Sequence, residues 1–81
     1  MSSPQEVKLT RTKEILKYIW EKTPTLAELL TVNEFRWGYS ERTFKQKLKY
    51  WNDLKLIALN KNTNKFHATK KLERLLIEGL I

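Results

Sequence analysis

The sequence predicts a small, mainly α-helical domain with one β-hairpin, in the order helix, helix, helix, strand, strand, helix. Four segments carry apolar residues at spacings of three and four, and each follows a residue that commonly caps a helix. Two runs of strand length separate the third of these segments from the fourth. With 81 residues, the chain is expected to form a single domain, residues 1–81, in which residues 1–9 are an N-terminal arm or an extension of the first helix.

The first helix is predicted to begin at residues 3–6 or up to two turns later, near Thr10. The sequence SPQE at residues 3–6 has the form of a capping box with proline at the first helical position. Pro24 should end this helix, because a proline disfavours the α conformation at the residue before it. Its core-facing stripe is predicted to comprise Thr12, Ile15, Leu16 and Ile19.

The second helix is predicted to start from a capping box. The Thr25 side chain should accept from the N–H of Glu28, and the Glu28 carboxylate from the N–H of Thr25. Gly38 can take a positive φ and should end the helix, with Trp37 and Tyr39 beside it packing over the helix. The residues that this helix, LAELLTVNEF, is expected to bury are Leu26, Leu29, Leu30 and Phe35.

The third helix is predicted to run from the N-cap Ser40 to about residue 55. On a helical wheel of about 100° per residue, Leu48 and Trp51 lie within roughly 40° of Phe44. These three residues should hold the helix on the core, with Leu54 at the edge of their stripe. The far side of the helix presents Arg42, Lys45, Gln46, Lys49 and Asp53.

After the third helix the hydrophobic pattern changes from helix to strand. The runs at residues 56–59 and 65–69 predict a hairpin whose tip, NKNTN, is rich in turn formers and basic. Thr69 should cap a last helix with a stripe of leucines. Ile77 and Ile81 fall outside this stripe. They either complete the core or, as we expect, form a homodimer interface built from the last helix, the first helix or both. The stripe comprises Leu72, Leu75, Leu76 and Leu80.

The positive charge of the chain is concentrated in one segment. The formal net charge is +7, and residues 40–71 hold nine basic and two acidic side chains, whereas residues 1–39 have a net charge of +1 and residues 72–81 of −1. Charge that serves only solubility would be spread more evenly. The asymmetry therefore predicts a surface that binds a polyanion, most simply nucleic acid.

Three segments carry a resemblance to a known family: SERTFKQKL (residues 40–48), LKLI (54–57) and FHATKKLERLL (66–76). They resemble the winged helix-turn-helix family, which commonly shows a Ser-x-x-Thr-apolar-x-x-x-Leu recognition helix, a Leu-Ile strand, a wing, and a Thr that caps the next helix. Two departures stand out. Lys55 occupies a position where the family often has glycine, and the segment from Glu28 to Ser40 is longer than the family's usual tight turn.

The resemblance implies that the third helix enters the major groove of double-stranded DNA, with its N-terminal half nearest the bases. Arg42 has the geometry for guanine and Gln46 for adenine, while lysine ammonium groups suit phosphates. Hydroxyls at the helix start suit a phosphate, and the wing lysines should reach the flanking backbone or the minor groove. The predicted DNA-binding residues are Ser40, Arg42, Thr43, Lys45, Gln46, Lys49, Lys61 and Lys65.

The expected function is therefore sequence-specific or semi-specific DNA binding by a small transcriptional regulator, cytoplasmic and associated with the nucleoid. The alternatives are a winged-helix adaptor between proteins and a non-specific architectural or partition protein. The chain has no cysteine, no glycine-rich phosphate loop and no apolar run of membrane-spanning length, so we expect no enzyme, cofactor, metal site, membrane contact or small-molecule ligand. His67 is read as a strand residue, and the Lys-, Ile- and Asn-rich composition suits an archaeal or viral source.

Overall fold

The computed structural model of the chain describes the backbone of residues 4–79 and the side chains of residues 11–79. Within this part the elements follow the layout of a winged helix, with three helices, a hairpin and a further helix, which confirms the predicted fold class. The elements are α1 (Pro4–Lys22), α2 (Leu26–Val32), a short π-helix η1 (Asn33–Trp37), α3 (Glu41–Asp53), β1 (Ile57–Asn60), β2 (Lys65–Ala68) and α4 (Lys70–Ile77).

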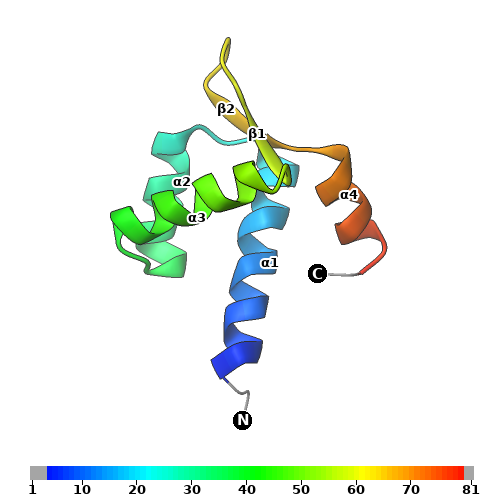
Figure 1. The fold of residues 1–81 in the computed structure, drawn as a ribbon. Helices are drawn as coiled ribbons and strands as arrows, with labels where there is room; N and C mark the ends of the chain where they lie inside the picture. Colours follow the sequence, from blue (N-terminus) through cyan, green and yellow to red (C-terminus); the bar gives the residue numbers. More distant parts are fainter. Residues whose placement is uncertain (1–3, 80–81) are drawn as a thin grey trace.

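Figure 1 shows α1 as the long central helix, with α3 lying across it, α2 to one side and α4 to the other. The hairpin extends beyond the C-terminal end of α1 (Figure 1). The helices and β1 surround one apolar core, since every element except the short β2 contributes a buried residue to it. These residues are Ile15, Leu16, Ile19, Leu29, Trp37, Phe44, Leu48, Trp51, Leu56, Ile57 and Leu72.

Helix α1 confirms the core-facing stripe predicted from the sequence. Ile15, Leu16 and Ile19 are buried, and Thr12 is half-buried beside them. The helix ends at Lys22, before Pro24, as the proline requires. The side chains of the capping box predicted at residues 3–6 lie outside the described residues.

The start of α2 also confirms its prediction. Thr25 Oγ1 accepts from the N–H of Glu28 at 3.2 Å, and Glu28 Oε1 accepts from the N–H of Thr25 at 3.4 Å. The expected burial of Leu26 is wrong, because this side chain is 36% exposed at the first turn of the helix. Leu29 is fully buried, and Leu30 is half-buried.

The expected burial of Phe35 is also wrong, since its side chain is 83% exposed. The buried stripe of α2 continues at intervals of four, through Leu29, Asn33 and Trp37. Phe35 lies two residues from each of the last two, so it points away from the core side of η1. A polar residue, Asn33, therefore occupies the position that the apolar pattern had assigned to phenylalanine.

Helix α3 follows its prediction closely. The Ser40 hydroxyl oxygen accepts from the N–H of Thr43 at 3.2 Å, so Ser40 caps the helix. Phe44, Leu48 and Trp51 are buried and anchor α3 to the core, while Leu54 at the edge of the stripe is 39% exposed.

The hairpin pairs β1 with β2 in antiparallel register, from Ile57 opposite Ala68 to Asn60 opposite Lys65. Strand β2 has a second partner that the sequence did not indicate. The N–H of Phe66 donates to the carbonyl of Pro24 at 2.8 Å, next to a single bridge between Lys65 and the α1–α2 connection. The base of the hairpin is therefore tied to the connection between α1 and α2.

Thr69 caps α4 as predicted, accepting from the N–H of Leu72 at 3.4 Å. Its hydroxyl also donates to the carbonyl of Lys55 at 2.5 Å, which ties α4 to the residues that precede β1. Leu72 is fully buried, and Leu75 and Leu76 are half-buried, while Leu80 lies outside the described residues.

Lys55 has a φ of 61°, in the left-handed region that favours glycine. We expect Lys55→Gly to raise the free energy of unfolding by about 0.5–1 kcal/mol. The left-handed conformation costs an L-residue about 1–2 kcal/mol, and the flexibility of glycine in the unfolded chain offsets about half of this. Urea denaturation measures the change. Asp53→Gly, in the last turn of α3, is the matched control and should destabilise by up to about 1 kcal/mol. A stability loss in Lys55→Gly would contradict this reading.

Candidate nucleic-acid interface

Helix α3 carries a polar, cationic face on the side opposite its buried stripe. All the side chains of this face are exposed, and they line one shallow hollow of about 420 Å³. The lining residues are Glu41, Arg42, Lys45, Gln46 and Lys49. The structure thus brings together four of the eight residues predicted to bind DNA.

The charges of this face are not equally available to a ligand. Lys45 Nζ lies 3.1 Å from Glu41 Oε1, one helical turn earlier, so its charge is partly offset. Arg42 and Lys49 form no ion pair with any described side chain. Arg42 and Lys49 are therefore the cations of this face whose charge no described side chain offsets.

The hydroxyl groups at the start of α3 are partly used by the fold. The Ser40 hydroxyl caps the helix and also donates to Thr43 Oγ1 at 2.9 Å. The one hydroxyl hydrogen that Ser40 could donate to a phosphate is thereby used within the fold. Thr43 is exposed, and its own hydroxyl hydrogen has no acceptor among the described residues.

Lys61 and Lys65 lie on the hairpin, and both are exposed. Neither lines the hollow of α3, so the structure places them at a separate part of the surface. A second groove of about 310 Å³ connects the two regions, because it is lined by residues of both α3 and the hairpin. Its lining residues are Leu26, Lys45, Leu48, Lys49, Asn52, Leu59 and Phe66.

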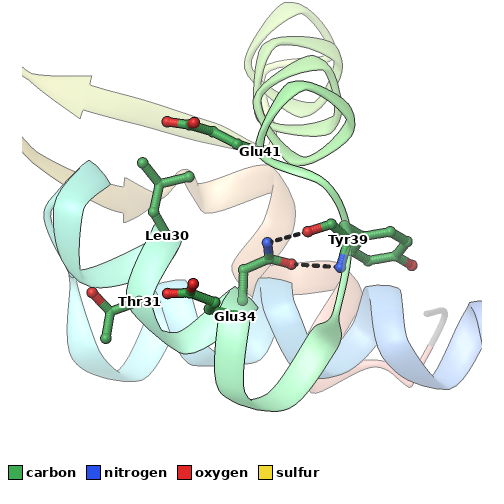
Figure 2. A pocket seen from close by; sticks show the side chains of 6 residues that line it. Leu30, Thr31, Glu34, Tyr39 and Glu41 are labelled. Carbon is green, nitrogen blue, oxygen red and sulfur yellow. Dashed lines mark hydrogen bonds between the residues drawn. The ribbon is translucent and has the colours of Figure 1, made fainter.

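The connection between α2 and α3 is held by Asn33, which is 3% exposed. Its Nδ2 donates to the carbonyl of Tyr39 at 2.7 Å, and its Oδ1 accepts from the N–H of Tyr39 at 3.1 Å; Figure 2 shows both bonds. Gly38, with a φ of 71°, allows the chain to turn back between these two residues. This closed turn sets where α3 begins.

The segment between Glu28 and Ser40, which is longer than the usual turn of the family, contains the π-helix η1 and this closed turn.

Sequence reasoning missed Asn33, although the spacing of four from Leu29 to Asn33 to Trp37 was visible. It also assigned Trp37 a place over α2, whereas this residue belongs to the core. The Trp37 ring stacks on Phe44 and meets Tyr18 edge to face, each with ring centroids 5.7 Å apart. Because Phe44 lies on α3, Trp37 links the turn to the helix that it positions.

The face beside this turn is acidic, in contrast to the rest of α3. A pocket of about 360 Å³ is lined by Leu30, Thr31, Asn33, Glu34, Tyr39 and Glu41, and Figure 2 shows how these side chains lie. Two carboxylates at this place repel an approaching phosphate. The side of α3 that carries Arg42 and Lys49 is therefore more favourable to an anion than the side that faces α2.

Several other predicted features can be located. His67 is exposed on β2, with Nδ1 3.3 Å from the carbonyl of Ala68. Ile77 is 68% exposed at the end of α4, while Ile81 lies outside the described residues. Among the described side chains, no three His, Cys, Asp or Glu residues gather closely enough to hold a metal ion.

None of the helices within residues 4–79 combines the length and the apolar character needed to cross a lipid bilayer. No family model matches the chain, and comparisons with curated proteins and with solved structures give no significant match.

Proposed function

We propose that this protein binds double-stranded DNA through α3, as a small transcriptional regulator. The observation that carries the proposal is the exposed face formed by Arg42, Lys45, Gln46 and Lys49, on a helix that Phe44, Leu48 and Trp51 fix to the core. The buried stripe holds the helix rigidly, so its outward side chains can meet a groove without reordering the fold.

The dimensions of α3 suit the major groove. Its 13 residues span roughly 20 Å, and the major groove, about 12 Å wide, admits an α-helix. Arg42 is the candidate for a bidentate contact with guanine, and Gln46 for one with adenine. Lys49 is the candidate for a phosphate contact, because an ammonium group is a point charge with little geometric selectivity.

The hairpin and α4 complete the proposal. Lys61 and Lys65 would contact the flanking backbone or the minor groove, in support of which both are exposed. A homodimer through α4 would present two copies of α3 to a symmetric site, and the 68% exposure of Ile77 supports it. Sedimentation of the protein–DNA complex measures this stoichiometry.

The test of the proposal is a mobility-shift titration of duplex DNA over a series of salt concentrations. We expect the logarithm of the binding constant to fall linearly with the logarithm of salt, with a slope of about −0.9 for each phosphate neutralised. Absence of binding to any duplex at low salt would contradict DNA binding and would leave the protein–protein adaptor as the better reading. Selection from a random duplex pool then separates a regulator, which enriches a sequence, from an architectural protein, which enriches none.

A further inference from the structure

A groove between α1 and α3 has a composition suited to an anion. Its volume is about 460 Å³, and it lies on the flank of α3 away from the hairpin. The lining side chains are Thr12, Thr43, Gln46, Lys47, Tyr50 and Trp51. They include three hydroxyls, an amide and an ammonium group but no carboxylate, so the lining offers hydrogen-bond donors and a positive charge.

A second cation stands near this groove. Lys47 Nζ lies 4.8 Å from the centroid of the Tyr39 ring, and Arg11 Cζ lies 5.1 Å from the same centroid. The two cations are therefore at most 9.9 Å apart, which is the sum of these distances. Neither forms an ion pair with a described side chain. An anion in the groove would be attracted by Lys47 directly and by Arg11 at longer range.

The position of this groove on α3 fits the proposed placement of the helix in the major groove. On a wheel of about 100° per residue, Lys47 lies roughly 200° around α3 from Lys45. Lys45 and Lys49 line the groove that faces the hairpin, whereas Lys47 lines the groove that faces α1. A helix in the major groove has a sugar–phosphate backbone on each side of it. The two flanks of α3 thus carry cations for two different strands.

We infer that the groove between α1 and α3 binds a backbone phosphate of the DNA strand on the α1 side. This inference rests on the proposed function. Lys47 supplies the charge, and the hydroxyls of Tyr50 and Thr43 supply donors, because the Thr43 hydroxyl hydrogen has no acceptor among the described residues. Helix α1 thereby becomes part of the DNA interface through Thr12, with Arg11 adding positive potential from its place beside the Tyr39 ring.

The test compares Lys47→Gln with Lys17→Gln in the mobility-shift salt series, using the full chain and one duplex. Lys17 is a matched control, because it is exposed on α1 roughly 140° from Thr12 and so faces away from the groove. We expect Lys47→Gln to reduce the salt slope by about 0.9 and the affinity at 0.1 M salt roughly eightfold, as the loss of one phosphate contact requires. Lys17→Gln should leave the slope unchanged.

Thermal unfolding shows whether Lys47→Gln perturbs the fold. If it does, a second variant tests the same groove. Tyr50→Phe removes one hydroxyl from an exposed side chain and should weaken binding roughly tenfold without changing the salt slope, because no charge is lost. Equal slopes for wild type and Lys47→Gln, or equal reductions in Lys47→Gln and Lys17→Gln, would overturn the phosphate site while leaving DNA binding by α3 intact. Failure of the wild type to bind any duplex would overturn both proposals.

Discussion

Replacement of Asn33 by alanine is expected to lower the free energy of unfolding by about 2–4 kcal/mol, since each buried group left without a partner costs about 1–3 kcal/mol. The substitution removes both hydrogen bonds from the Asn33 side chain to the backbone of Tyr39. The Tyr39 N–H and carbonyl lose these partners in a turn where Asn33 is 3% exposed. Urea denaturation followed by tryptophan fluorescence measures the loss, because Trp37 is buried in the same turn.

Asn52→Ala is the matched control for this measurement. Asn52 is exposed on α3, and its side chain makes none of the hydrogen bonds found among the described residues, so we expect a change within about 0.5 kcal/mol. A similarly small change in Asn33→Ala would show that Gly38 and the packing of Trp37 hold the turn without the asparagine.

Replacement of both Lys49 and Lys61 by glutamine is expected to weaken binding to every duplex roughly 60-fold at 0.1 M salt. Two lost phosphate contacts reduce the salt slope by about 1.8. Their contribution to the binding constant disappears near 1 M salt. At 0.1 M, which is tenfold lower, the variant therefore binds about 10^1.8-fold more weakly than the wild type. Both side chains are exposed, so the fold should remain intact. Mobility shifts with a selected duplex and with a random duplex measure the effect.

Two further sets of variants test whether the change in affinity is electrostatic and whether it depends on the DNA sequence. Glu41→Gln removes the carboxylate beside Lys45 and should strengthen binding to all duplexes. Arg42→Ala and Gln46→Ala should instead change which sequence is preferred, by roughly 1–3 kcal/mol at the affected base pair. The protein is a non-specific binder if each variant loses as much affinity for the random duplex as for the selected one. This comparison covers the variants of Lys49, Lys61, Arg42 and Gln46.

The starts of α2, α3 and α4 and the outward face of α3 could be predicted from the sequence because they depend on local signals. The caps at Thr25, Ser40 and Thr69 involve residues three apart, and the buried stripe of α3 follows from helical periodicity alone. The hairpin followed from two strand-like runs around a turn-forming segment. Each of these features is decided by residues that are neighbours in the chain.

The features that sequence reasoning missed or misassigned depend on contacts between distant segments. Phe35 was assigned to the core because it is large and apolar, yet Asn33 and Trp37 occupy the core side, where Tyr39, Tyr18 and Phe44 give them partners. A buried polar group is stable only when specific partners meet it, and hydrophobicity alone does not reveal them.

The sequence by itself therefore determined the order of the elements and which side of α3 is polar. Only the tertiary structure decided that Lys47 and Arg11 approach one tyrosine ring, and that β2 pairs with the connection after α1. The physical reason is that side chains and backbone groups far apart in the chain become neighbours only when the core packs, and their charges and hydrogen bonds act over a few ångströms.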